Sequence, residues 1–235
     1  MSFAERLATA REALRIWLEA VVGPGPIPRL DEALSHPSFA NENGSRNYQR
    51  LEFLGDAVLG LCVSEMLSTA YPEADEGCLT RMRSAMVNAE ALAAWARRLD
   101  LGTCIALGRG ATLGSEREQT NVLADAAEAL LAAVYEARGL EGARSLVREA
   151  LGELLAKADS LSVLDPKSEL QQRVQAEGMP APTYRVIEVR GAPHEQAFKV
   201  EVIVEEQPIA SGEGRSKRLA ERAAALAALE VLGKL

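Results

Sequence analysis

Two apolar helical stretches of this chain each carry a pair of carboxylates, and this pattern constrains the fold most. The pairs are Glu52 with Asp56 in LEFLGDAVL, and Asp125 with Glu128 in LADAAEAL. Because the members of each pair are four and three residues apart, each pair lies on one face of a helix. Buried carboxylates need a partner, and neither apolar run contains Lys or Arg. Four hard oxygen ligands from two helices suit Mg²⁺ or Mn²⁺, so the sequence predicts a metal site between them.

The composition favours a helical protein, and its charge must be interpreted region by region. The 235 residues are enough for one large or two modest domains, and 48% of them are hydrophobic. Aromatic residues make up only 4%, while Ala and Leu dominate, which favours helices. A net charge of −8 argues against a nucleic-acid-binding protein as a whole. However, four basic residues cluster near the end of the chain: Arg215, Lys217, Arg218 and Arg222.

The sequence also predicts a soluble, cytoplasmic protein without a membrane partner. Cys62, Cys78 and Cys104 are an odd set without the spacing of a metal site, as expected of reduced thiols. The first 20 residues are charged throughout and lack the apolar core of a signal peptide. No run approaches the roughly 18 apolar residues of a membrane-spanning helix.

The pattern changes along the chain from helical to mixed. Helices are expected at 3–21, 47–70, 79–99, 121–137 and 142–156, and the Gly-rich stretch 107–117 is expected to be a loop. Further helices are expected at 167–177 and 216–232, with an alternating strand at 198–205 between neighbours at 183–189 and 207–210. We therefore predict a mainly α domain at 1–157, a linker at 158–164 and a small α-β-β-β-α domain at 165–235.

Several motifs occur in an order that is typical of one known family. They are NYQRLEFLGDAVLGL (47–61), LTRMRSAMVN (79–88), NVLADAAEALLAAVY (121–135) and, in the tail, DPKSELQQ, PTY, GAPHEQAF and GEGRSKRLAERAAA. On these motifs the chain resembles bacterial ribonuclease III over nearly its whole length. The resemblance implies a mainly α endonuclease domain that homodimerises, followed by a small α+β double-stranded-RNA-binding domain.

The resemblance also implies an activity and its site residues. The activity is Mg²⁺-dependent hydrolysis of both strands of double-stranded RNA, with Mn²⁺ as a substitute ion and no small-molecule cofactor. The implied products carry 5′-phosphate and 3′-hydroxyl ends, and the implied substrates are ribosomal RNA precursors and other structured transcripts. By motif position, Glu52, Asp125 and Glu128 are metal ligands, and Asp56 and Glu128 are catalytic.

Three regions of the tail are expected to contact RNA. Duplex RNA is recognised by its shape, its 2′-hydroxyls and its phosphates, because side chains cannot read its deep major groove. Amides on the first tail helix and a turn between strands suit the minor groove, and a basic helix start suits phosphates. The residues are Gln171, Gln172 and Gln175; Pro193 and His194; and Arg215, Ser216, Lys217 and Arg218.

A few positions near the motifs have secondary or open roles. Gln49 stands where many family members carry Glu; a glutamine can hydrogen-bond RNA but adds no negative charge. Glu76 matches a family acid, and we expect it to pair with a base across the dimer. His36 is too isolated to be proposed as a catalytic base. Phe53 and Leu54 belong either to the dimer interface or to the core of the monomer.

Three functions compete at this point. The first is a double-strand-specific endoribonuclease, the second is a catalytically silent protein that binds double-stranded RNA, and the third is a metal-binding helical regulator with an unrelated tail. The presence of Glu52, Asp125 and Glu128 favours the first over the second. Metal-dependent cleavage, binding without cleavage, or no interaction with duplex RNA would distinguish the three.

Overall fold

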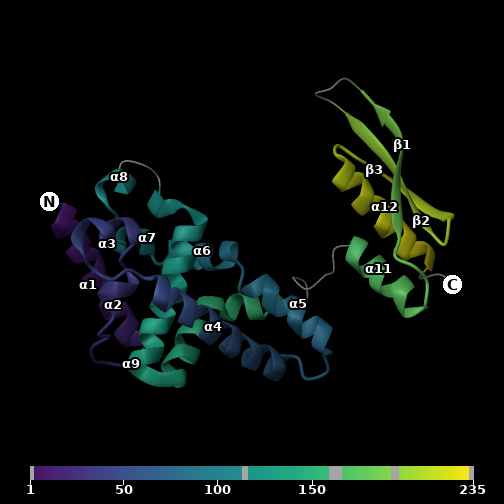
Figure 1. Cartoon of the computed structure of the whole chain (residues 1–235). Coiled ribbons are helices and arrows are strands. Elements are labelled where there is room, and N and C mark those ends of the chain that lie inside the picture. The colour runs from purple at the N-terminus through teal and green to yellow at the C-terminus, as the bar shows by residue number, and fades with distance from the viewer. Residues whose placement is uncertain (1–2, 113–115, 159–165, 192–195, 233–235) are drawn as a thin grey trace. The chain divides into compact units, whose positions relative to one another are not determined.

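The structure consists of two compact units, which are described separately. It is a computed structural model that describes residues 3–112, 116–158, 166–191 and 196–232. The units are Met1–Ser162 and Val163–Leu235 (Figure 1). The predicted linker at 158–164 lies almost wholly outside the described residues, so the proposed domain boundaries stay a prediction.

Helices build the first unit. In chain order they are α1 (Phe3–Val22), α2 (Leu30–Ala33), α3 (Pro37–Asn43), α4 (Gln49–Ala70), α5 (Glu76–Met86), α6 (Ala89–Arg98), α7 (Leu101–Cys104), α8 (Arg109–Thr112) and α9 (Thr120–Leu155). The helices expected at 3–21 and 47–70 match α1 and α4 closely. The expected loop at 107–117 is only partly correct, because it contains α8 and the start of a 3₁₀ turn at Glu116–Glu118.

Two local features determine where the other helices divide. The stretch 79–99, expected as one helix, is interrupted between α5 and α6 because Asn88 caps α6: its Oδ1 accepts a hydrogen bond from Ala91 N at 2.9 Å. The helices expected at 121–137 and 142–156 are both present, and they carry one label, α9, because they join across a kink at Gly139. Gly139 has φ 66° and ψ −166°, a conformation that glycine adopts readily because it has no Cβ.

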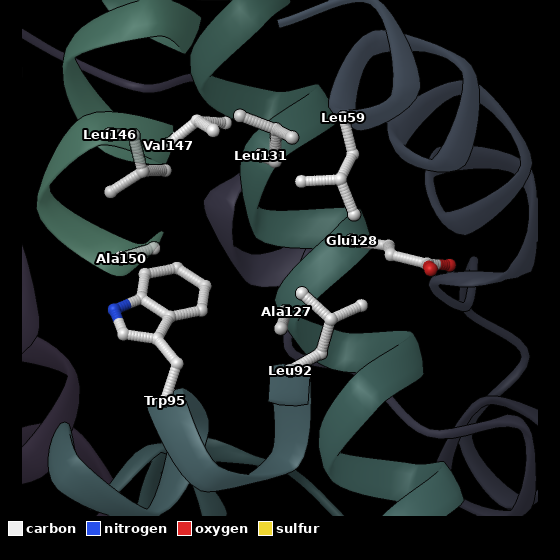
Figure 2. A pocket seen from close by; sticks show the side chains of 9 residues that line it. All are labelled: Leu59, Leu92, Trp95, Ala127, Glu128, Leu131, Leu146, Val147 and Ala150. Atoms are coloured by element: carbon white, nitrogen blue, oxygen red, sulfur yellow. The ribbon is translucent and has the colours of Figure 1, made fainter. Parts of the chain in front are cut away.

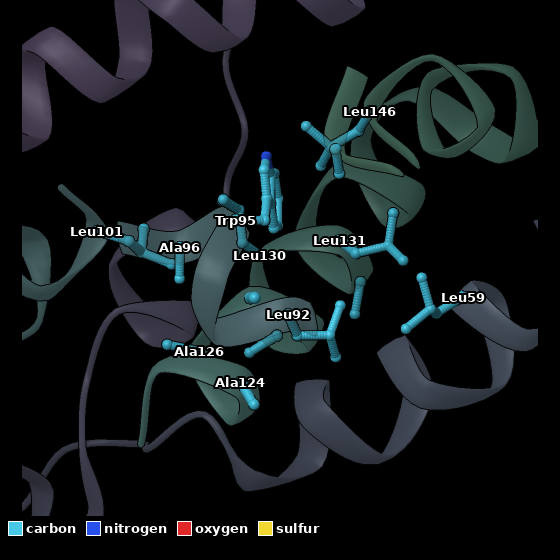
Figure 3. Close-up of a cluster of buried hydrophobic side chains, with 14 of the residues drawn as sticks. Leu59, Leu92, Trp95, Ala96, Leu101, Ala124, Ala126, Leu130, Leu131 and Leu146 are labelled. Atoms are coloured by element: carbon cyan, nitrogen blue, oxygen red, sulfur yellow. The ribbon is translucent and has the colours of Figure 1, made fainter. Parts of the chain in front are cut away.

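The core of the first unit lies between α4, α6 and α9. Leu59 from α4, Leu92 and Trp95 from α6, and Leu131 and Leu146 from α9 converge there (Figure 3). Each of these five side chains is at most 4% exposed. Helix α9 is rich in buried alanines, which let its neighbours approach closely. The core therefore fixes the two acid-bearing helices, α4 and α9, against each other.

Helix α4 is more apolar than the sequence analysis expected. It is long and apolar enough to cross a membrane by length and composition, with a mean hydropathy of 1.4, which corrects the expectation that no run approaches that length. A core helix passes the same test, and 33% of this window is buried inside the chain. The exposed part includes Phe53 at 83% and Leu61 at 48% exposure, which leaves an apolar strip on the outer face of α4.

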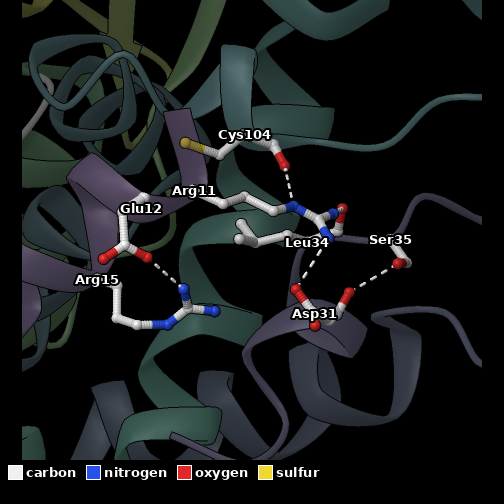
Figure 4. A network of polar contacts seen from close by, with 7 residues as sticks. All are labelled: Arg11, Glu12, Arg15, Asp31, Leu34, Ser35 and Cys104. Atoms are coloured by element: carbon white, nitrogen blue, oxygen red, sulfur yellow. Dashed lines mark hydrogen bonds and ion pairs between the residues drawn. The ribbon is translucent and has the colours of Figure 1, made fainter. Parts of the chain in front are cut away.

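A polar network ties α1 to the segment that leads toward α3 and α4. The Arg11 guanidinium donates to Cys104 O at 3.0 Å and to Leu34 O at 2.9 Å, and it pairs with Asp31 at 2.9 Å (Figure 4). Because a single side chain holds α1, α2 and the end of α7 together, the chain enters α3 from a fixed position.

The second unit confirms the predicted order of helix, three strands and helix. Its elements are α11 (Pro166–Ala176), β1 (Thr183–Arg190), β2 (Ala197–Val204), β3 (Gln207–Gly214) and α12 (Lys217–Leu232). The strands pair antiparallel in the order β1-β2-β3, and both helices share one core with the sheet. A Cβ on Gly212 would lie 2.1 Å from Ala224 N, so this glycine lets α12 pack directly on β3.

Candidate active site

The two acid-bearing helices touch at the level of their backbones. Gly55 of α4 lies against Glu128 of α9, and a Cβ at position 55 would be 1.9 Å from the Glu128 carbonyl oxygen. No side chain fits there, so glycine alone permits this approach. Gly55 lies three residues after Glu52 and directly before Asp56, so the contact brings this acid pair close to Glu128.

The four predicted acids form one electrostatic group. The pKa of Glu128 is raised to about 7, first by burial and then by the charges of Asp56, Asp125 and Glu52. Burial also raises the pKa of Glu52 and of Asp125, and the Asp125 charge adds to the rise at Glu52. No Lys or Arg of the described residues is among the groups that shift these three pKa values. The carboxylates therefore repel one another without a Lys or Arg side chain to offset the repulsion.

The Glu128 side chain passes through an apolar environment. With Leu59, Leu92, Trp95 and Ala127 it lines a small cavity between α4, α6 and α9. Figure 2 shows that its carboxylate points away from Trp95, so the aliphatic stem contributes to the apolar packing while the charged end leaves it. This partial burial disfavours the charged carboxylate and is the largest cause of the raised pKa of Glu128.

Tyr48 and His36 also belong to this site, and sequence reasoning missed both. Tyr48 is 2% exposed, and its hydroxyl donates to Asp125 Oδ2 at 3.5 Å. Burial, together with the charges of Asp125 and Glu52, raises the pKa of Tyr48. The His36 ring packs edge-on against Tyr48 with 5.7 Å between ring centroids. Burial lowers the pKa of His36, and the charges of Glu116 and Asp125 oppose this change. His36 is therefore not isolated in the fold, and the expectation that it is no catalytic base stays a prediction. Tyr48 stands four residues before Glu52, and this spacing was the available signal.

The donor set fits a divalent cation by its chemistry. Within the described part of the chain, no three His, Cys, Asp or Glu side chains are gathered as a ready-made metal cluster. The four carboxylates offer hard oxygen ligands in a shared negative field, which suits Mg²⁺ or Mn²⁺. An open arrangement is typical of Mg²⁺, which binds through one or two carboxylates, waters and substrate phosphates rather than in an all-protein cage. The ligand roles of Glu52, Asp125 and Glu128 stay predictions.

The two accessory residues each line a hollow of their own. Gln49 is exposed and lines a separate hollow with basic side chains, among them Arg46 and Arg50. Glu76 begins α5, accepts a hydrogen bond from Thr80 Oγ1 at 3.1 Å and lines a hollow with Ser64 of α4. Ser64 lies 12 residues beyond Glu52, which is roughly 18 Å along a helix. The cross-dimer role of Glu76 stays a prediction.

Phe53 and Leu54 are expected either in a dimer interface or in the core of the monomer, and the two residues differ in this respect. Phe53 is 83% exposed, so it does not belong to the core of the monomer. Leu54 is half-buried and packs against that core. Of the two, Phe53 offers the larger exposed surface to a partner subunit.

The side chains predicted to contact RNA are exposed wherever the structure describes them. They are Gln171, Gln172 and Gln175 on α11, and Arg215, Ser216, Lys217 and Arg218 at the start of α12. Pro193 and His194 lie outside the described residues. Ser216 also caps α12, because its Oγ accepts a hydrogen bond from Leu219 N at 3.3 Å. The first turn of α12 carries no acidic residue, so its positive end and its basic side chains present one sign of charge.

Comparison with known families assigns both units. Residues 29–154 match the family described as ribonuclease-III-like, and residues 166–232 match the double-stranded RNA binding motif. The chain belongs to the ribonuclease III family. Members of this family are endoribonucleases specific for double-stranded RNA, and this chain is such an enzyme.

Individual relatives cover most of the chain. Ribonuclease 3 of Thermobifida fusca is 44% identical over 205 residues, which are 86% of this chain and 85% of the relative. Ribonuclease 3 of Geobacter metallireducens is 44% identical over 215 residues, covering 88% and 87%. The crystal structure of the ribonuclease III nuclease domain from Campylobacter jejuni is 34% identical, with a TM-score of 0.53 over 58% of this chain and 92% of that chain. The family thus spans both units, and the solved relative matches the nuclease unit.

Proposed function

We propose that this enzyme uses Mg²⁺ to hydrolyse both strands of double-stranded RNA, leaving 5′-phosphate and 3′-hydroxyl ends, and that Mn²⁺ substitutes for Mg²⁺. The observation that carries the proposal is the group of four carboxylates on α4 and α9, where burial and the charges of the other three acids raise the pKa of Glu128 to about 7. A divalent cation relieves this repulsion, and a phosphodiester substrate supplies further oxygen ligands.

The chain's own residues divide the work in this proposal. Glu52, Asp125 and Glu128 hold the ion, which when bound lowers the pKa of a water and neutralises charge on the phosphoryl group. Asp56 is exposed on α4 and acts electrostatically on Glu128, so its carboxylate is available to orient the attacking water. Tyr48 and the apolar side of Glu128 limit the movement of the ligands.

The proposal includes a homodimer in which each site cuts one strand. An exposed apolar strip on α4, with Phe53 at 83% and Leu61 at 48% exposure, supports it, because such strips mark interaction surfaces. In the Campylobacter jejuni nuclease domain a region is involved in dimer formation, and that domain is similar to 58% of this chain. Two copies of the second unit then bind the same duplex, which strengthens RNA binding by avidity.

We further propose a cytoplasmic location and a role in processing ribosomal RNA precursors and other structured transcripts. In the described part of the chain, Cys62, Cys78 and Cys104 are thiols outside any disulfide, as expected of a reducing compartment. The proposed substrates follow from the family resemblance. The exposed basic residues at the start of α12 can bind RNA phosphates, and such binding does not depend on RNA sequence.

The test uses the full chain and a long RNA duplex, with Mg²⁺ in one reaction and EDTA in the other. We expect cleavage with Mg²⁺ only, retention of the complex on native gels with EDTA, and fragments that a 5′-phosphate-dependent exonuclease degrades. Binding without cleavage at saturating Mg²⁺ would identify a silent RNA-binding protein instead. Cleavage that continues unchanged in EDTA would refute the metal dependence.

A further inference from the structure

We propose that Tyr48 is a positioning residue that holds the Asp125 carboxylate in place for the metal ion. The inference rests on the proposed Mg²⁺-dependent function and deepens it, because it names a residue outside the four acids on which ion binding depends. The contact that carries it is the hydrogen bond from the Tyr48 hydroxyl to Asp125 Oδ2 at 3.5 Å, which links the start of α4 to α9.

The backbone fixes Tyr48 in relation to Glu52. Tyr48 O accepts hydrogen bonds from Leu51 N at 2.8 Å and from Glu52 N at 2.9 Å, and Tyr48 N donates to Ser35 O at 3.0 Å. The spacing of four residues places Tyr48 on the same helical face as Glu52. The Tyr48 side chain is buried, at 2% exposure. Tyr48 therefore approaches Asp125 from a position that the first turn of α4 determines.

A second set of contacts, through His36 and Ser38, supports the Tyr48 ring. The His36 ring lies edge-on to Tyr48 at 5.7 Å between centroids and 72° between planes. His36 Nδ1 accepts from Ser38 N at 3.1 Å and lies 2.7 Å from Ser38 Oγ, which in turn accepts from Gly108 N at 3.0 Å. The segment after α7 thus positions His36 through Ser38, and the His36 ring in turn packs against Tyr48.

The hydrogen bond between the Tyr48 hydroxyl and the Asp125 carboxylate matters to both groups in this buried environment. A buried hydroxyl without a partner is costly, and Asp125 Oδ2 is its hydrogen-bond partner in the described part of the chain. Groups that hydrogen-bond a ligating carboxylate fix its orientation, and their loss costs about 10–100-fold in metal affinity. Because 3.5 Å is longer than a typical hydroxyl hydrogen bond, we expect an effect at the lower end, about tenfold.

The test compares Tyr48→Phe with Tyr71→Phe in the full chain. Tyr71 is a matched control because its hydroxyl also links the two helices, donating to Leu155 O at 2.8 Å from the far end of α4. Binding of Mn²⁺ without RNA is measured by electron paramagnetic resonance of the free ion, and folding is checked by thermal unfolding. We expect the Kd for Mn²⁺ to rise about tenfold in Tyr48→Phe and by less than about twofold in Tyr71→Phe.

A double-mutant cycle separates positioning from a general structural effect. If Tyr48 acts through Asp125, adding Tyr48→Phe to Asp125→Asn changes the Kd for Mn²⁺ by less than about twofold. In cleavage assays, Tyr48→Phe should need more Mg²⁺ for half-maximal rate, while KM for RNA stays unchanged.

The outcomes also separate this inference from the proposed function. If the wild-type chain binds Mn²⁺ and Tyr48→Phe binds it equally well, the positioning role is refuted and the proposed function stands. The positioning role is also refuted if the tenfold loss persists in the Asp125→Asn background. If the wild-type chain binds no Mn²⁺ at millimolar concentrations, the proposed function fails and the positioning role fails with it.

Discussion

Adding one methyl group at Gly55 should disrupt the candidate active site. The new Cβ would meet three backbone atoms of Glu128, the carbonyl oxygen at 1.9 Å, the carbonyl carbon at 2.5 Å and Cα at 3.0 Å. Ordinary contact begins near 3.4 Å, so α4 and α9 must separate by about 1.5 Å at this point. Overpacking of this kind costs about 1–3 kcal/mol, and we expect the upper end because backbone cannot move aside as a flexible side chain can. The better helix propensity of alanine returns about 1 kcal/mol, which leaves a net loss of about 2 kcal/mol.

Gly152→Ala is the matched control for Gly55→Ala. Gly152 lies within α9, and a Cβ there would have nothing within 4 Å, so this change should stabilise the protein by about 0.5–1 kcal/mol. Both variants are compared by urea unfolding at one protein concentration, followed by tryptophan fluorescence. Trp17 and Trp95 are the chain's two tryptophans and both lie in the first unit, so the signal reports that unit alone.

The same variant should also lose Mn²⁺ affinity and cleavage at temperatures at which it is folded, because a displacement of about 1.5 Å is large for a catalytic site. Equal unfolding free energies for Gly55→Ala and Gly152→Ala would refute the close approach of α4 and α9. Normal cleavage by a folded Gly55→Ala variant would refute the dependence of the site on that approach.

Three further predictions follow from the pKa values, the basic helix start and the exposed strip. The raised pKa of Glu128, about 7, means that the folded state keeps a proton that the unfolded state releases above about pH 4.5, so the stability contributed by this group is lost as the pH rises from about 4.5 to 7. Glu128→Gln should therefore stabilise the metal-free protein by about 1 kcal/mol at pH 8, after discounting for partial exposure, and have little effect at pH 4; equal effects at both pH values in urea unfolding with EDTA would contradict this. Lys217→Ala should weaken RNA binding and reduce the slope of log affinity against log salt by about one, whereas an unchanged slope would remove Lys217 from the RNA contacts. Phe53→Ser should raise the dimer dissociation constant at least about tenfold in sedimentation experiments with little change in monomer stability, because the side chain is 83% exposed; an unchanged dimer would exclude Phe53 from the interface.

The elements of the fold were predictable because their signals are local. Alternation over 198–205 gives β2, and the spacing of apolar residues gives α4 and α9, within one or two residues of the observed ends. The error at 79–99 also has a local cause, because Asn88 caps α6 inside a stretch that periodicity alone joins to α5. The helices expected at 121–137 and 142–156 are both present, one on each side of the non-helical Gly139.

The site was predictable only as far as its motifs reach. The pairs Glu52/Asp56 and Asp125/Glu128 are visible as acids in apolar runs, but the contact that joins the two runs is not. Tyr48 meets Asp125 across 77 residues of sequence, and no local pattern pairs them. The role of Gly55 has the same origin, because the need for glycine arises from the backbone of another helix.

The central claim is that the four carboxylates hold the ion that cleavage requires, and one comparison tests it directly. Glu128→Lys is measured against Glu153→Lys, an equal charge change at an exposed position near the end of α9, with long duplex RNA at saturating Mg²⁺. The account predicts that both variants bind the duplex, that Glu153→Lys cuts it at the wild-type rate, and that Glu128→Lys does not cut it. Cleavage by Glu128→Lys at the wild-type rate would contradict the account, because a lysine at that position cannot ligate the ion.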